Sequence, residues 1–230
     1  MATNHSIKST GRRGFLGLLA TGAASLGINI LSPVKSIAEE TYSGNAADPD
    51  TWFNQIKGKH KIVYDSPHPN GIFPFAWPRV FLLTNAATGS PEKDCNVVVV
   101  LRHDSIPYAM EDRLWEKYNF GEVFHVKDPQ GNTIKKNPFW KPAKDTYQVP
   151  GIGTVEIGIN ELQSSGVMFC VCEAALTVYS AAVAKGMNGD AAEVRKDWVS
   201  GILPGIQPVP SGVWALGRAQ EKGCGYIYAG

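Results

Sequence analysis

The residues best suited to chemistry lie in one short stretch, Gly166-Val-Met-Phe-Cys-Val-Cys-Glu-Ala-Ala-Leu176. An apolar run ends on Cys172 and turns at once into an Ala-rich segment, which predicts a buried strand followed by a helix. A thiol at that point sits over a helix N-terminus, where the partial positive charge favours the thiolate. Cys172 is therefore the first candidate for a nucleophile or a sulfur carrier. The alternative is a structural cysteine, because a free cysteine also packs as a small hydrophobe.

The two neighbours of Cys172 have simpler interpretations. Cys170 lies two residues earlier and so faces the same side of the strand, and a Cys-x-Cys pair could bind a soft metal such as copper. In a strand, however, two such sulfurs lie several ångströms apart, which favours packing as the role of Cys170. Glu173 is expected to complement the helix dipole, although its charge would also repel a nearby thiolate.

A second group of polar residues, Arg102-His103-Asp104, closes the apolar run over residues 97–101. If that strand neighbours the strand that ends at Cys172, His103 and Cys172 share one edge of the sheet. His103 could then exchange a proton with the thiol. Arg102 could hold an anion there, because a guanidinium suits anionic groups.

His68 also follows a strand end, in a loop that Pro67 and Pro69 stiffen. Two histidines and a cysteine would suit zinc or copper, so Cys172, His103 and His68 are weak candidates for metal ligands. The alternative for His68 is a solvated loop residue. Three residues of a long loop, His125, Lys127 and Asp128, could also reach over the site.

Regular elements must position these residues, and their order along the chain indicates the fold. The predicted strands cover residues 61–64, 96–101, 167–171, 206–209 and 225–228. The predicted helices cover residues 75–88, 105–118, 154–165, 174–185, 190–202 and 211–222, with Ser105 and Ser211 as N-caps. Strands that alternate with helices predict an α/β fold, a three-layer α/β/α sandwich around a mostly parallel sheet of about five strands.

The long irregular segment, residues 119–151, is rich in prolines and aromatic residues. A loop of this length is either functional or disordered. Its aromatic residues favour an ordered loop that packs on the domain or on a neighbouring subunit.

The first 38 residues have the layout of a secretory signal. The pair Arg12-Arg13 precedes a mildly apolar run over residues 15–31, and small residues before Ala38 suit cleavage there, which indicates the twin-arginine export pathway. The alternative is a retained N-terminal anchor helix. Residues 39–58 are predicted to form a linker or lead-in, and residues 59–230 one domain.

Removal of residues 1–38 takes away four cationic residues and no acids, so the formal net charge falls from +1 to −3. This weakly acidic composition gives no support for nucleic-acid binding. The mature chain of about 190 residues is expected to be soluble and periplasmic. It has four cysteines, too few for a disulfide scaffold, and their redox state is left open. No nucleotide-binding glycine loop, paired-carboxylate hydrolase site or serine elbow is present.

The C-terminal half carries a family resemblance. Gly166-Val-x-Phe-x-Val-Cys-x-x-Ala-Leu176, Leu203-Pro-Gly-Ile-x-x-Val-Pro-Ser-Gly-Val213, and then Leu216, Gln220, Gly223 and Tyr226-Ile227 resemble the DsrE/DsrF-like family of sulfur-relay proteins. The resemblance implies a three-layer α/β domain that assembles into homo-oligomers, trimers or hexamers. It also implies that the cysteine after the Val-rich strand, here Cys172, carries sulfur as a persulfide. Export and the long 119–151 segment depart from the cytoplasmic sulfur-relay members.

Two functions therefore remain open from the sequence. The first is an exported, thiol-based sulfur-handling protein that needs no cofactor, in which Cys172 reacts and His103 and Arg102 assist. The second is a non-catalytic module on the same fold, which binds a small ligand or a metal, copper or zinc, or serves oligomeric assembly.

Overall fold

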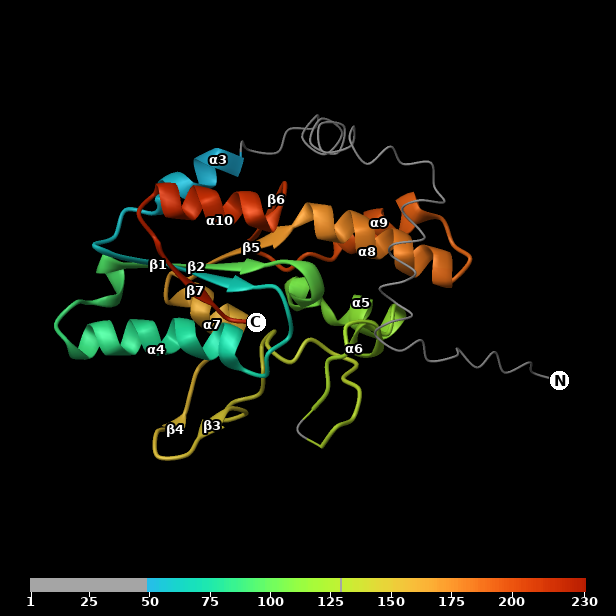
Figure 1. The fold of residues 1–230 in the computed structure, drawn as a ribbon. Coiled ribbons are helices and arrows are strands. Elements are labelled where there is room, and N and C mark those ends of the chain that lie inside the picture. The colour runs from blue at the N-terminus through green and yellow to red at the C-terminus, as the bar shows by residue number, and fades with distance from the viewer. Residues whose placement is uncertain (1–48, 129) are drawn as a thin grey trace.

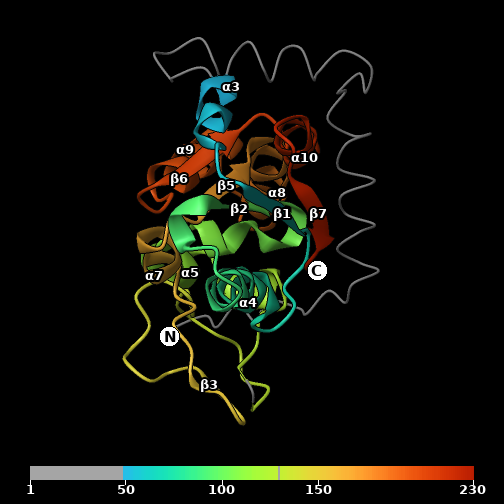
Figure 2. The same ribbon diagram turned by 90° about the vertical axis from the view of Figure 1, so that its left-hand side faces the viewer.

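The computed structural model describes residues 49–128 and 130–230. The predicted leader over residues 1–38 lies outside these residues. The described chain is a three-layer α/β/α sandwich around a five-stranded sheet with the strand order β6-β5-β2-β1-β7 (Figures 1 and 2). The predicted fold class is thus confirmed.

All five strands of the sheet are parallel, so their carboxyl ends meet at one edge. They are β1 (His60–Ser66), β2 (Cys95–Leu101), β5 (Met168–Cys172), β6 (Ile206–Val209) and β7 (Gly225–Tyr228). Each agrees with a predicted strand to within a few residues. The neighbours of β2 are β1 and β5, which brings the ends of the Cys172 and His103 strands together, as the sequence analysis required.

Helices cover both faces of the sheet and its carboxyl edge. On one face lie α4 (Phe73–Ala87) and α7 (Ile159–Ser164), and on the other lies α10 (Gly212–Glu221) with the short α3 (Pro49–Trp52) (Figure 2). Beyond the carboxyl ends of the strands, α8 (Glu173–Gly186) packs against α9 (Ala191–Ser200), near the short α5 (Asp112–Lys117) and α6 (Phe120–Val123) (Figure 1).

The hydrophobic core has two parts, one on each face of the sheet. Successive side chains of a strand alternate between faces, so Val97 and Val99 of β2 join the larger cluster while Val98 and Val100 join the smaller one under α10. The β-branched run of β2 is buried on both faces for this reason. Phe53 from the short 3-10 helix η1 (Phe53–Gln55) belongs to the smaller cluster, so the described end of the predicted lead-in packs on the domain.

The predicted helix over residues 105–118 is wrong. The chain forms a 3-10 helix η3 (His103–Ala109), breaks at Met110 and Glu111, and then forms the six-residue helix α5. Ser105 lies inside η3 and is no N-cap, since its hydroxyl donates to the carbonyl oxygens of Ser66 and Arg102. The break at Met110 lets that residue bridge to Ile202, a tertiary contact that the helical spacing could not reveal.

The predicted helix over residues 154–165 begins too early. Residues 148–154 form a small hairpin of β3 (Gln148–Val149) and β4 (Gly153–Thr154), and α7 starts only at Ile159. Gly158 precedes the helix, and its N–H donates to the Glu161 carboxylate at 2.7 Å, which fixes the start of the helix.

The long segment over residues 119–151 packs on the domain. Phe120, Phe124 and Phe139 are buried in the larger core cluster, and the Phe139 ring stacks on Phe75 of α4 with centroids 4.0 Å apart. The structure thus confirms an ordered loop that packs on its own domain.

Candidate functional site

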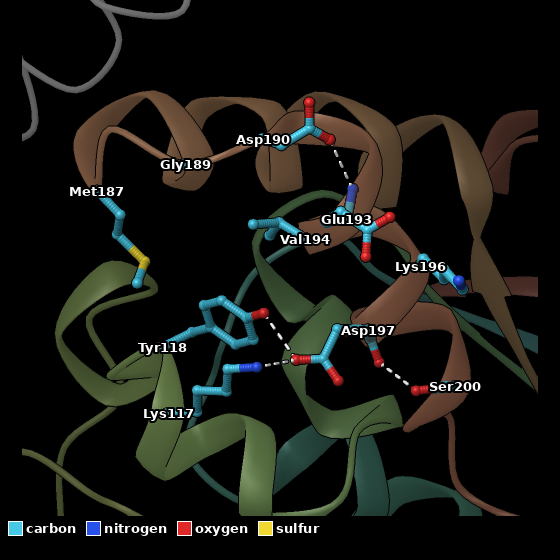
Figure 3. A pocket seen from close by; sticks show the side chains of 10 residues that line it. All are labelled: Lys117, Tyr118, Met187, Gly189, Asp190, Glu193, Val194, Lys196, Asp197 and Ser200. Carbon is cyan, nitrogen blue, oxygen red and sulfur yellow. Dashed lines mark hydrogen bonds and ion pairs between the residues drawn. The ribbon is translucent and has the colours of Figure 1, made fainter.

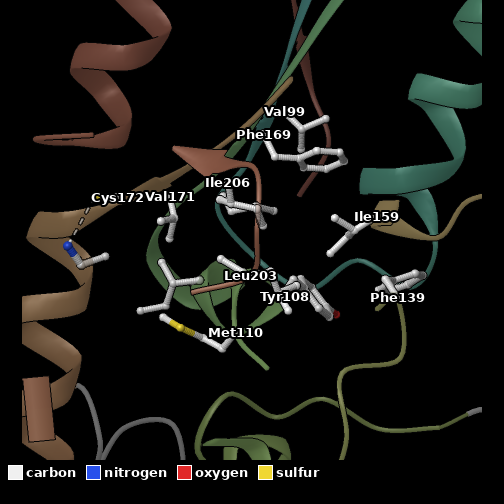
Figure 4. Close-up of a cluster of buried hydrophobic side chains, with 14 of the residues drawn as sticks. Val99, Tyr108, Met110, Phe139, Ile159, Phe169, Val171, Cys172, Leu203 and Ile206 are labelled. Atoms are coloured by element: carbon white, nitrogen blue, oxygen red, sulfur yellow. Dashed lines mark hydrogen bonds between the residues drawn. The ribbon is translucent and has the colours of Figure 1, made fainter. Parts of the chain in front are cut away.

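Cys172 is the last residue of β5 and the N-cap of α8. Its Sγ accepts a hydrogen bond from the Ala175 N–H at 3.3 Å, and the first turn of the helix adds positive potential at the sulfur (Figure 4). The residue is 6% exposed, so the thiol lies just below the surface at the edge of the core. The predicted strand-end, helix-start position is confirmed, but the sulfur is more enclosed than an openly presented thiol.

Arg102 lies directly beside Cys172. Leu101 of β2 pairs with Val171 of β5. The residues that follow them, Arg102 and Cys172, are therefore neighbours at the edge of the sheet. A hydrogen bond to Asp65 raises the pKa of Arg102, and the Cys172 sulfur contributes to this rise in the same direction. The guanidinium and the thiol are therefore close enough to interact electrostatically, as the predicted shared edge requires.

A buried carboxylate fixes the Arg102 side chain. Asp65, in β1 and 2% exposed, accepts bonds from Arg102 Nε at 2.7 Å and Nη2 at 2.9 Å. Its Oδ2 also accepts a bond from the Tyr226 hydroxyl of β7 at 2.8 Å. This bidentate pair gives the guanidinium one defined orientation. The sequence reasoning missed Asp65 and Tyr226, although an acid at the end of the strand Ile62-Val-Tyr-Asp65 was a visible signal.

Gly212, the first residue of α10, packs tightly on the Arg102 stem. A Cβ at this glycine would lie 2.5 Å from the Arg102 Cβ, a distance that real side chains do not adopt. Ser211 is the N-cap of α10, as predicted, and its hydroxyl accepts from the Trp214 N–H at 3.2 Å. The Ala174 N–H donates to the Pro210 carbonyl at 3.2 Å, which ties the start of α8 to the start of α10.

His103 lies at the same sheet edge but binds a partner that the sequence analysis did not name. Its Nδ1 is 2.6 Å from the hydroxyl of Tyr179 in α8, and that hydroxyl donates to the Asp104 carboxylate. His103 has a positive φ of 52°. Left-handed backbone is uncommon outside glycine, and here the Tyr179 contact holds the ring in place.

Tyr179 lies on the helix that Cys172 caps. It follows Cys172 by seven residues, or two helical turns, so both lie on one side of α8. Burial first, and then the bond to Asp104, raise the pKa of Tyr179 far above its ordinary value, and Cys172 adds to the rise. Tyr179 is therefore a neutral hydroxyl near the thiol. Its spacing from Cys172 was a signal that sequence reasoning could have used.

His68 completes the polar group on the outer side. Its Nδ1 lies 3.2 Å from Asp104 Oδ2, and its ring centroid is 5.4 Å from that of His103.

The hydrogen bonds also indicate the tautomer of His103. Because the Tyr179 O–H donates to Asp104, the Tyr179 oxygen accepts from the Nδ1–H of His103. In that arrangement the Nε2 atom of a neutral His103 ring is an acceptor.

Among the described residues, no three His, Cys, Asp or Glu side chains are grouped so that they could hold a metal ion. The weak metal candidates Cys172, His103 and His68 are thus not brought together as ligands. His68 and His103 instead share the Tyr179 and Asp104 network.

The other three cysteines are buried free thiols, like Cys172. Cys170 is fully buried in the smaller core cluster, and burial raises its pKa far above the ordinary value. Burial likewise raises the pKa of Cys95 and of Cys224. These three environments favour the neutral thiol and fit packing roles.

Glu173 is a buried acid at the start of α8. Burial raises its pKa to about 6, and the Arg195 charge of α9 acts in the opposite direction. Within the described residues, its Oε2 meets no hydrogen-bond donor. The carboxyl is therefore less well satisfied than an ordinary capping acid.

Two residues of the long loop that were predicted to reach over the site, Asp128 and His125, do not lie there. Asp128 accepts bonds from Asn132 and from the Gln130 N–H, which closes a turn. His125 is exposed, and its backbone has a positive φ of 56°. Neither residue forms part of the polar group around Cys172.

A separate hollow of about 550 Å³ lies between α5 and α9 (Figure 3). Asp197 lines it and accepts bonds from Lys117 Nζ and the Tyr118 hydroxyl, each at 2.7 Å, as well as from Arg113. Burial acts to raise the pKa of Asp197, but these three bonds hold it well below its ordinary range. The acid is thus committed to an ion-pair network that joins two helices.

Comparison of the chain with known proteins identifies no related protein. No protein-family model matches the chain, and no curated protein or solved structure is significantly similar to it.

No helix of the described residues has the length and apolar character needed to cross a membrane.

Proposed function

We propose that this chain is an exported, DsrE-like sulfur-handling protein in which Cys172 takes up a sulfur atom as a persulfide and passes it to an acceptor thiol. One observation carries the proposal. Of the four cysteines, all of them described, Cys172 is the one that caps a helix and receives an N-terminal N–H, and a fixed guanidinium lies beside it. Such surroundings support a thiolate as a nucleophile.

The chemistry needs no external oxidant. The Cys172 thiolate attacks a terminal sulfur of a polysulfide, a new Sγ–S bond forms, and the shortened polysulfide leaves with the electron pair of the broken S–S bond. In the second step the thiolate of an acceptor attacks the outer sulfur, and the Cys172 thiolate leaves. His103, at the same edge of the sheet, would take up or return the proton of the resting thiol through its Nε2 atom, while Tyr179 holds the ring from Nδ1.

Export and assembly are part of the proposal. The leader over residues 1–38 supports transport through the twin-arginine machinery to the periplasm, with cleavage after Ala38. The family resemblance supports a trimer or hexamer. Apolar side chains exposed on α4, Phe73, Val80 and Leu83, offer a surface for contacts between subunits. Light scattering of the purified protein measures the oligomer directly.

The test of function is the mass of the intact protein after brief treatment with polysulfide and removal of the reagent. We expect the wild-type protein to gain the mass of one sulfur atom, and the Cys172→Ser variant to gain none. Cys224→Ser is the matched control and keeps the gain. A gain that persists in Cys172→Ser assigns the sulfur to another thiol. No gain, together with copper or zinc found by elemental analysis, favours the non-catalytic ligand- or metal-binding module.

A further inference from the structure

We infer that an anion subsite adjoins Cys172, in which Arg102 supplies the positive charge while Asp65 and Tyr226 are positioning residues. The inference rests on the proposed function in taking Cys172 as the reacting thiol. It adds the residues that would bind the sulfur donor, a small anion with negative charge next to the sulfur that is transferred.

Two hydrogen bonds to Asp65 fix the orientation of the Arg102 side chain. The buried Asp65 engages Nε and Nη2, so the Nη1 side of the guanidinium lies outside this pair. The arginine side chain is 24% exposed and the aspartate side chain 2%. The pair is neutral as a whole, but its positive end is partly exposed and comes from the position beside Cys172 in the sheet register, while its negative end is enclosed. An anion approaching Cys172 therefore meets the positive end first.

Further contacts restrain the Arg102 side chain and its partner Asp65. Tyr226 binds the carboxylate from β7, and Gly212 closes on the arginine stem from α10. A freely moving surface arginine would lose side-chain entropy on binding an anion. Arg102 is already restrained in the folded protein, so it loses less entropy when an anion binds. Four segments that are distant in sequence, β1, β2, β7 and α10, thus converge on one guanidinium.

Two helices begin beside Arg102 and Cys172. The first turn of α8 begins at Cys172 and that of α10 begins at Gly212, and both helices direct N-terminal dipole charge toward this corner of the sheet. The Asp65 carboxylate is enclosed, so within this pair the guanidinium is the group that an anion can reach. This corner suits a compact anion such as a polysulfide.

The experiment compares two alkylating reagents of equal chemistry and different charge. Iodoacetate is an anion and iodoacetamide is neutral, and the Cys172 thiolate attacks the CH2 carbon of each in the same way, with iodide as the leaving group. The ratio of their rates at Cys172, measured by peptide mass spectrometry, cancels any change in thiolate fraction. We expect Arg102→Gln to lower the iodoacetate-to-iodoacetamide ratio about three- to tenfold, the range for loss of one partly screened charge near the sulfur.

Tyr226→Phe tests the positioning role, because it leaves every charge in place. We expect about a twofold fall in the ratio, since the freed carboxylate would hold the guanidinium less firmly. Tyr228→Phe is the matched control on the same strand, with 49% exposure against 44% for Tyr226, and it should leave the ratio unchanged. Arg218→Gln is the control for general loss of positive charge.

An unchanged ratio in Arg102→Gln overturns the subsite, and so does a Cys172 that reacts with neither reagent. An equal ratio in Tyr226→Phe and Tyr228→Phe overturns the positioning role. A protein that takes up sulfur but shows an unchanged ratio keeps the proposed function and loses the subsite. A protein that shows the expected ratio but takes up no sulfur loses the proposed function instead.

Discussion

Glu173 should make the protein less stable above about pH 6. Its carboxyl is buried at the first residue of α8, and burial raises its pKa from the ordinary 4.5 to about 6. Below pH 4.5 the group is protonated in both the folded and the unfolded chain, so no stability is lost there. As the pH rises, the unfolded chain releases its proton first, and the free energy of unfolding falls until the pH exceeds the folded pKa.

The size of this loss follows from the pKa values. A rise from 4.5 to about 6 corresponds to about 2 kcal/mol. Water that reaches the helix end reduces the effect, so we expect about 1–2 kcal/mol. Glu173→Gln removes the titrating group and keeps the shape of the side chain. The free energy of unfolding of the variant, relative to wild type, should therefore rise by this amount between pH 4.5 and pH 7.5.

Urea unfolding at the two pH values measures this difference. The exposed Glu116→Gln of α5 is the matched control, and its difference from wild type should stay constant. Any fixed cost from losing an acid at a helix N-terminus cancels, because only the change with pH is compared. If the Glu173→Gln difference is the same at pH 4.5 and pH 7.5, or shrinks as the pH rises, the account of a poorly satisfied buried carboxyl is refuted.

Three further substitutions test other parts of the structure. Asp197→Asn should cost about 1 kcal/mol at pH 7 in urea unfolding, and this cost should shrink steadily as the pH falls below about 4, because the unfolded chain takes up the proton there while the folded carboxyl stays ionised by its bonds to lysine and tyrosine. Gly212→Ala should destabilise the protein by about 1–3 kcal/mol and displace Arg102, since the new methyl group clashes with its stem; unchanged stability would contradict this packing. Tyr179→Phe should cost about 1 kcal/mol and free the His103 ring, which NMR of the ring protons would detect as a change of its surroundings.

The fold was predictable because its main signals are local. The β-branched run of β2 and the apolar run before Cys172 predict buried strands, and Ser211 predicts the start of a helix. The segment after β2 was not predictable, since the break at Met110 depends on a bridge to Ile202, almost a hundred residues away in the chain. Helical spacing alone cannot register such a contact.

The candidate site was predictable in part for a related reason. Parallel strands end at one edge, so the positions of Cys172, Arg102 and His103 follow from strand ends once the neighbours are guessed. The residues that hold them do not follow. Asp65 and Tyr179 act through side-chain geometry that arises only when β1 and α8 pack beside β2. The enclosure of the Cys172 thiol likewise depends on tertiary packing.

The most direct test of the central claim is cyanolysis of the sulfur-loaded protein. Protein treated with polysulfide and freed of reagent is mixed with cyanide, which removes the outer sulfur of a persulfide as thiocyanate and returns the thiolate. We expect about one thiocyanate per chain for wild type and for Cys170→Ser, and none for Cys172→Ser. Thiocyanate released in equal amount by Cys172→Ser would contradict the claim that Cys172 carries the sulfur.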